Sequence, residues 1–197
     1  MKRIGTTLLA AALLLAACNN NKPKEATYVS TDGKEKVSVD VNQMTNAMQE
    51  YQKKTEELQK LTPYSLDEMK AMIPESLSGA ARKSFEVNSA MGVSTANARY
   101  AVNDSTSIHV EIMDCAGTAG VGIYGLQFVG MMNTQRETED EYSKTIDFNG
   151  GRAIESCQKN RVECKLTFFT KDRLLVNLEG ENVNADGLKQ AAKELKL

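Results

Sequence analysis

Three residue types found together in serine hydrolases alternate in one stretch of this chain: Ser107, His109 and Glu111. A catalytic relay needs the hydroxyl, imidazole and carboxylate in successive hydrogen-bond contact, beside an oxyanion hole. The stretch alternates like a β-strand, in which side chains two residues apart are separated by about 6.5–7 Å. This separation is too large for a direct relay. We therefore interpret the three residues as polar positions on the wetter face of a sheet. His109 is the only histidine, so no other imidazole is available as a base or a ligand.

A glycine motif, G-x-G-x-x-G, occupies residues 120–125. In a dinucleotide site such glycines allow a tight turn, close approach to the pyrophosphate and binding at a helix N-terminus. Here several residues separate the motif from the preceding predicted strand, the neighbouring pattern is antiparallel, and no further βαβ units follow. We interpret the motif as part of a packing helix and expect no cofactor.

The same glycines lie in an uncharged run, Ala119 to Met132. A run of this length is typical of a core helix. A role facing an apolar ligand or the membrane is the alternative, since the methionines would suit an adaptable apolar surface. The candidate ligand-binding residues in that alternative share helical spacing; they are Val121, Tyr124, Phe128, Met131 and Met132.

Two cysteines, Cys157 and Cys164, flank a turn predicted at Asn160-Arg161. Pairing of the residues next to the turn puts the cysteines directly opposite each other on one face. Their Cβ atoms would lie about 4.5–5.5 Å apart, which a twisted hairpin can bring to disulfide geometry. We predict a structural cross-strand disulfide; two free thiols or a redox role are the alternatives.

Metal binding has little support in the sequence. Cys115, Cys157, Cys164 and His109 are suitable ligand types, but no C-x₂₋₄-C spacing occurs. The acidic run at 137–141 is predicted to be a solvated loop, because it lacks the EF-hand pattern that favours calcium. We predict no metal site.

The elements that position these residues follow from the periodicity of apolar residues. Helices are predicted at 43–61, at 65–73 behind a Ser65–Glu68 capping box, at 117–132, and at 185–195 behind an Asn184 cap. Seven strands are predicted, at 82–88, 94–102, 106–114, 142–148, 151–157, 162–170 and 173–179. Short turns such as Asn149-Gly150 favour antiparallel pairing. The predicted fold class is α+β: an antiparallel sheet of about six to seven strands with helices packed on its faces.

The first residues resemble a bacterial lipoprotein signal. Lys2 and Arg3 precede an apolar segment, and Leu15-Ala16-Ala17-Cys18 is similar to a lipobox. The resemblance implies cleavage after residue 17 and lipidation of Cys18, which then holds the protein to a membrane through its acyl chains. Each buried methylene contributes about 0.8 kcal/mol, so several chains anchor firmly. The absence of Asp after Cys18 favours the outer membrane of a Gram-negative cell envelope, on either its periplasmic or its surface face.

Further resemblances concern the folded part of the chain. Five short stretches resemble a set of uncharacterised lipoproteins of Gram-negative envelopes: Ile73-Pro74-Glu75-Ser76-Leu77, Ala90-Met91-Gly92, Ala98-Arg99-Tyr100, Ile112-Met113-Asp114 and 183–197. The order of elements is similar in outline to the Mog1/PsbP-like α/β/α sandwich. The first resemblance implies no activity. Mog1 and PsbP bind protein partners, but none of their binding residues is evident here.

Four segments are predicted: a signal peptide (1–17), the lipidated cysteine with a polar linker or weak hairpin (18–41), a helical segment (42–73) and an α/β sandwich domain (74–197). Without its signal the chain carries 22 basic and 26 acidic residues, a net charge of −4, and shows no basic patch for nucleic acid. We predict a non-enzymatic binding module in the cell envelope that binds a partner protein or another envelope component. A carrier of a lipid or other apolar ligand is the alternative, and an enzyme with an unrecognised carboxylate site is the third possibility.

Overall fold

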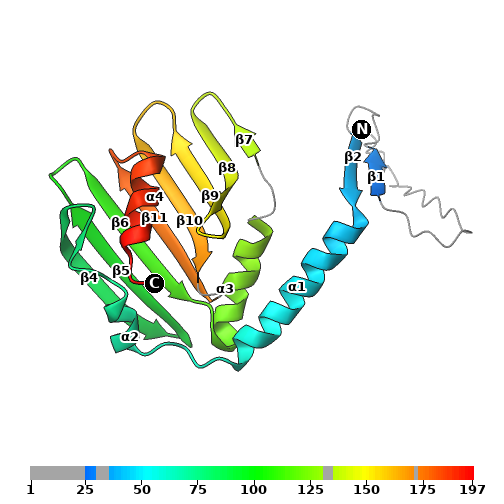
Figure 1. The fold of residues 1–197 in the computed structure, drawn as a ribbon, viewed down its shortest axis with the longest axis horizontal. Coiled ribbons are helices and arrows are strands. Elements are labelled where there is room, and N and C mark those ends of the chain that lie inside the picture. Colours follow the sequence, from blue (N-terminus) through cyan, green and yellow to red (C-terminus); the bar gives the residue numbers. More distant parts are fainter. Residues whose placement is uncertain (1–24, 30–35, 131–134, 171–172) are drawn as a thin grey trace, which may run out of the picture. The chain divides into compact units, whose positions relative to one another are not determined.

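The protein is described by a computed structural model, which covers residues 25–29, 36–130, 135–170 and 173–197 (Figure 1). The chain divides into two compact units, residues 1–48 and residues 49–197. In the first unit, β1 (Glu25–Val29) and β2 (Lys36–Asp40) form an antiparallel hairpin that leads into α1 (Val41–Lys60). Within the described residues, no helix is both long enough and apolar enough to cross a membrane.

The second unit is built on one nine-stranded antiparallel sheet. Its strands, in spatial order, are β3 (Ser76–Leu77), β4 (Ala80–Ala90), β5 (Val93–Ala101), β6 (Ser107–Asp114), β11 (Leu174–Glu181), β10 (Glu163–Thr170), β9 (Gly151–Gln158), β8 (Glu141–Phe148) and β7 (Gln135–Glu137). The two halves of the chain therefore meet at the β6–β11 pair. Short turns account for the meander: Asn149 and Gly150 both have positive φ, as a two-residue hairpin turn requires.

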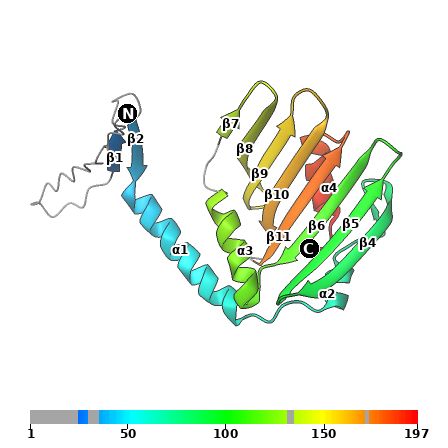
Figure 2. The ribbon, with the colours of Figure 1, turned by 180° about the vertical axis from the view of Figure 1, so that it is seen from behind.

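Helices cover both faces of this sheet (Figures 1 and 2). On one face, α2 (Leu66–Ala71) and α4 (Ala185–Glu194) pack on the main apolar core. On the other face, α3 (Gly117–Gly130) and the second half of α1 cover a smaller cluster that includes Leu58, Cys115, Val121 and Leu175. The remainder of that second face is polar, because residues such as Arg99, His109, Lys165 and Glu179 alternate with the core residues.

The two predicted helix N-caps, Ser65 and Asn184, are confirmed. The Ser65 hydroxyl accepts the Glu68 amide, and the Glu68 carboxylate accepts the Ser65 amide, so the capping box of α2 is complete. The Asn184 side chain accepts the Gly187 amide at 2.8 Å and caps α4.

The segment between α1 and α2 is fixed by a buried carboxylate. Asp114, fully buried at the end of β6, accepts the Tyr64 amide at 2.7 Å. Arg173 binds the same carboxylate through two nitrogens and covers the Tyr64 ring. Its guanidinium also donates to the Thr62 carbonyl at 3.0 Å. This cluster ties the connection between α1 and α2, residues 62–65, to the middle of the sheet.

The predicted fold class is correct in outline, and the predicted number of strands is too low. The sheet has two further strands, β3 and β7, of two and three residues at its two edges. Segments this short carry no alternation of apolar residues, so periodicity cannot detect them. β7 lies partly in the predicted acidic loop, where Gln135–Glu137 pairs with β8.

Candidate functional site

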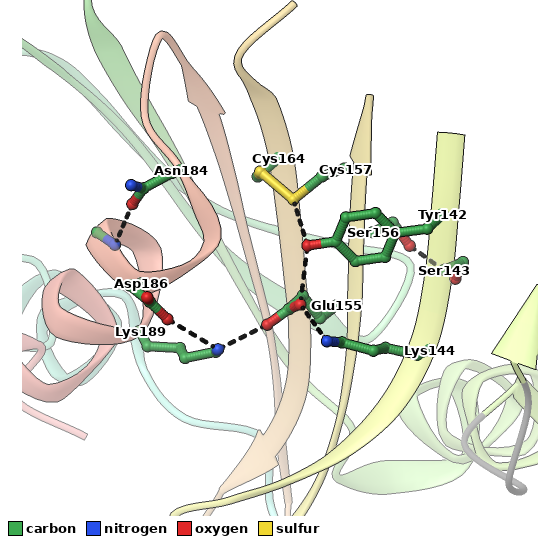
Figure 3. The surroundings of a disulfide bond; sticks show 11 residues. Tyr142, Ser143, Lys144, Glu155, Ser156, Cys157, Cys164, Asn184, Asp186 and Lys189 are labelled. Atoms are coloured by element: carbon green, nitrogen blue, oxygen red, sulfur yellow. Dashed lines mark hydrogen bonds and ion pairs between the residues drawn. A yellow bond between two sulfur atoms is a disulfide. The ribbon is translucent and has the colours of Figure 1, made fainter. Parts of the chain in front are cut away.

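A pocket of ≈ 560 Å³ opens beside the β9–β10 turn (Figure 3). Strands β8, β9 and β10 and the first turns of α4 supply its walls. This places the pocket on the α4 face of the sheet, next to the main core. Fourteen residues line it: Tyr142, Lys144, Glu155, Cys157, Gln158, Lys159, Asn160, Arg161, Val162, Cys164, Asn184, Ala185, Asp186 and Lys189.

A disulfide forms one edge of the pocket. Cys157 and Cys164 are directly opposite in the β9–β10 register and are joined by a disulfide, with their Cα atoms 4.1 Å apart. Both residues are buried. The bond closes the hairpin just before its turn, so the turn residues 159–162 that line the pocket emerge from a cross-linked base.

Glu155 lies at the base of the pocket and is 2% exposed. Its Oε1 accepts the Tyr142 hydroxyl at 2.9 Å and lies 3.2 Å from Lys144 Nζ. Its Oε2 lies 2.7 Å from Lys189 Nζ, off the direction of a hydrogen bond, so this contact is an ion pair alone. One buried carboxylate therefore holds two ammonium groups, one from β8 and one from α4.

The charges explain why Glu155 is ionised. Burial raises the pKa of this carboxyl, and the contacts from Lys189, Tyr142 and Lys144 outweigh burial, so its pKa lies below the usual value. Contact with Glu155 in turn raises the pKa of Lys189. The pair is therefore charged at neutral pH, as an otherwise costly buried carboxylate requires.

Tyr142 connects the charged cluster to the disulfide. Its hydroxyl lies 2.9 Å from Glu155 Oε1 and 3.2 Å from Cys157 Sγ (Figure 3). The single hydroxyl proton goes to the carboxylate, which is the stronger acceptor. Burial, together with the Glu155 charge, raises the pKa of Tyr142. Tyr142 is thus a fixed donor within the wall.

The start of α4 completes the pocket. Asn184, Ala185 and Asp186 line it, and Lys189 reaches back from the next turn to Glu155 and to Asp186 at 3.1 Å. The first amides of a helix have no partner inside the helix, and this end of the helix dipole is positive. The lining contains four cationic and two acidic side chains and no histidine. Such a wall can bind and orient a ligand through charge and hydrogen bonds.

A second pocket, of ≈ 460 Å³, lies along the other flank of α4. Apolar side chains at the ends of β3, β5 and β6 and after β11 contribute to it: Leu77, Tyr100, Val102, Ile108 and Val183. On its rim, Glu194 accepts the Ser78 amide at 2.6 Å. Helix α4 therefore has a charged pocket on one flank and a more apolar one on the other.

The structure separates the residues of the apparent catalytic triad. The Ser107 hydroxyl donates to Glu181 at 2.8 Å, and Glu111 accepts from Asn177 at 2.9 Å. His109 is exposed between Arg99 and Glu179 on the neighbouring strands. Ser107 and Glu111 thus form separate hydrogen bonds on the polar sheet face, and His109 is the partner of neither bond.

The glycine motif contributes to packing in α3. A Cβ on Gly120 would lie 2.4 Å from the Cys115 carbonyl carbon, and one on Gly125 would lie 2.6 Å from the Tyr51 hydroxyl. The strand before the motif, β6, is antiparallel to both neighbours, unlike the parallel strand of a dinucleotide site.

Of the predicted ligand-binding residues, the two whose side chains the structure describes, Val121 and Tyr124, line neither of these two pockets. Val121 is buried, and the Tyr124 ring lies between those of Tyr51 and Phe169. The side chain of Phe128 is outside the described residues, as are Met131 and Met132.

The remaining predicted sites concern lipidation, free thiols and metals. Cys18 and the signal segment lie outside the described residues. Cys115 is a buried free thiol, and burial raises its pKa to about 12. Among the residues that the structure describes, no group of three or more histidine, cysteine or acidic side chains is placed to hold a metal ion.

Sequence reasoning missed Glu155, Lys189 and Tyr142. A usable signal was present: Glu155 alternates with Ala153 and Cys157 along β9 and so faces the core, where an acidic side chain is buried only if it is paired.

Comparison of the chain with protein-family models, with curated proteins and with solved structures found no match.

Proposed function

We propose that this protein is a non-enzymatic binding module of the cell envelope, tethered through lipidated Cys18, and that it recognises an envelope component at the pocket beside the disulfide. The observation that carries the proposal is the construction of that pocket. Glu155, 2% exposed, fixes Lys144 and Lys189 from two different elements. A preformed polar wall of this kind is suited to recognition, because little side-chain freedom is lost on binding.

The turn at residues 159–162 also supports recognition of an envelope component at this pocket. It contributes two cations, Lys159 and Arg161, at the rim of the pocket. Arg161 is paired with Glu163 at 3.0 Å and remains largely exposed. Rim charges of this kind increase the rate of encounter and the specificity for a partner of opposite charge. An acidic surface on the envelope component is the corresponding expectation.

In-cell crosslinking with affinity capture and mass spectrometry tests this function. We would compare the wild type with Cys18→Ala, Arg161→Gln and the matched control Lys165→Gln, whose lysine pairs with Glu179 on the opposite sheet face. We expect one component that is enriched by the wild type and by Lys165→Gln and reduced in the other two variants. Equal capture by all four proteins, or no specific capture, would reject the proposal.

The second pocket favours one other function, that of an apolar-ligand carrier. Its volume, ≈ 460 Å³, lies in the range of small-molecule sites, and apolar side chains such as Leu77 and Ile108 line it. Native mass spectrometry of the protein purified from its own membranes would test this function. A reproducible non-covalent lipid, lost when Ala80→Trp fills the pocket, would favour the carrier.

A further inference from the structure

The residues that line the pocket beside the disulfide include more basic than acidic side chains, although the chain is negative overall. The lining cations come from two elements and one turn: Lys144 on β8, Lys159 and Arg161 on the turn, and Lys189 on α4. The lining acids are Glu155 and Asp186. By contrast, acidic residues exceed basic ones over the whole sequence, 26 against 24. Two of the lining cations are paired with acids outside the lining, Lys159 with Glu137 at 2.6 Å and Arg161 with Glu163 at 3.0 Å. The other two, Lys144 and Lys189, share the single buried carboxylate of Glu155, and the positive charge available to a ligand lies there.

Neither acid blocks an incoming anion. Glu155 is enclosed beneath Lys144 and Lys189, which neutralise it. Asp186 has a side chain that is 89% exposed and is free to turn into solvent, leaving Lys189. An ammonium has three donors, so both lysines retain hydrogen-bond capacity after their contact with Glu155.

Backbone amides add directional donors at the same place. Helix α4 has ten residues, and Asn184 caps it by accepting the Gly187 amide. The amides of Ala185 and Asp186 belong to the same first turn, and both residues line the pocket. A helix start flanked by fixed ammonium groups stabilises an anion by charge and by hydrogen bonds together.

We propose that the pocket binds a phosphate-bearing ligand, with the phosphate between Lys144, Lys189 and the first turn of α4. This inference rests on the proposed binding function and names the chemistry of its site. Lys144 and Lys189 share one carboxylate, and their remaining N–H groups can donate to the phosphate oxygens. The volume, ≈ 560 Å³, leaves room for an organic group beyond the phosphate. The source is either a soluble phosphate ester or the headgroup of an anionic lipid.

Isothermal titration calorimetry on the full chain in a neutral detergent tests the proposal. The probes are glycerol 3-phosphate, glycerol as the uncharged control, and phosphatidic acid added to the micelles. We expect saturable binding of glycerol 3-phosphate and no binding of glycerol. Much tighter binding of phosphatidic acid than of glycerol 3-phosphate would identify a headgroup as the source, and equal binding would identify a soluble ester. Absence of binding by both phosphates would overturn the proposal.

Variants that change the charge of the pocket are expected to change its affinity for phosphate in a defined direction. Arg161→Gln removes a largely exposed rim cation and is expected to weaken binding roughly three- to tenfold, the effect of one charge on a nearby dianion. Glu155→Gln removes a lining acid and is expected to tighten binding. Lys165→Gln, on the other sheet face, is expected to leave binding unchanged. Weakening by Lys165→Gln equal to that by Arg161→Gln would overturn the site, since it would indicate non-specific attraction.

If Glu155→Gln is less stable than the wild type, the shift in its melting temperature on adding phosphate still measures binding. Without its carboxylate, Lys144 and Lys189 repel each other, and bound phosphate is expected to raise the melting temperature more in this variant than in the wild type. No greater shift in the variant would contradict the proposal. If phosphate binds but no envelope component is captured, the phosphate site is supported and the partner function is rejected. If an envelope component is captured but phosphate does not bind, the partner function is supported and the phosphate site is rejected.

Discussion

Replacing Lys189 by Gln removes one of the two cations that hold the buried carboxylate of Glu155. In the native protein, Lys189 Nζ lies 2.7 Å from Glu155 Oε2, and its side chain is 29% exposed. Lys144 and Tyr142 still contact Oε1 in the variant. The substitution therefore halves the cationic support of a carboxylate that is 2% exposed.

The size of the effect follows from what remains in the variant. Breaking a fully buried ion pair by removing one partner costs about 3–5 kcal/mol. Here one ammonium and one hydroxyl stay in place, and Lys189 is partly solvated, so we expect a loss of about 1–3 kcal/mol in the free energy of unfolding at pH 7. The double variant Glu155→Gln/Lys189→Gln is expected to recover part of this loss, because no charge is then left unpaired.

The loss depends on pH in a defined direction. The pKa of Glu155 is lowered in the folded wild type, so its contribution to stability is present above the unfolded pKa, about 4.3, and is lost as pH falls through the folded pKa. In Lys189→Gln, one of the contacts that lower the pKa of Glu155 is lost, so burial raises the pKa of this carboxyl in the folded protein. The difference in stability between variant and wild type is therefore expected to be largest near pH 7 and to shrink below about pH 4.

Urea unfolding followed by far-UV circular dichroism at pH 7 and pH 3 measures both quantities. Lys165→Gln is the control, since its exposed pair with Glu179 contributes only about 0–1 kcal/mol. A Lys189→Gln loss no larger than that of the control, or a loss equal at both pH values, would refute the reasoning about Glu155.

Three further predictions concern α3, the disulfide and the anchor. Gly120→Ala is expected to lose about 1–3 kcal/mol of stability in urea unfolding, because its Cβ would meet backbone just after β6 at 2.4 Å. The matched Gly122→Ala, with nothing within 4 Å, is expected to gain up to about 1 kcal/mol; equal effects of the two would contradict the packing account. Non-reducing peptide mapping is expected to recover Cys157 and Cys164 linked, with a loss of about 2.5 kcal/mol on reduction from loop closure alone, and alkylation of both without reductant would disprove the link. Cys18→Ala is expected to move the protein from the detergent phase to the aqueous phase in Triton X-114 partitioning, and unchanged partitioning would contradict lipidation.

Periodicity and turn chemistry predict most of the sheet. The seven long strands follow from alternation, and the Asn149-Gly150 turn follows from residues that accept positive φ. Helices α2 and α4 begin at their predicted positions because Ser65 and Asn184 cap them through local contacts. The edge strands β3 and β7 depend on pairing with a neighbour, which local patterns do not encode.

The candidate site was not predicted because its parts come from distant segments. Tyr142 and Glu155 meet across neighbouring strands, and Lys189 arrives from a helix that crosses the same face. Alternation marks Glu155 as an acid in an inward position, but it does not name the cations that neutralise it. The cysteine pair was accessible to sequence reasoning because only one short turn separates its members.

Site-specific photocrosslinking in living cells tests whether an envelope component binds at the pocket beside the disulfide. A photoreactive amino acid would replace Asn160, an exposed turn residue that lines the pocket, and in a matched control Lys165, exposed on the opposite sheet face. We expect one discrete adduct from position 160, lost when Arg161→Gln is added, and no such adduct from position 165. The same adduct from both positions, or from position 165 alone, would contradict it.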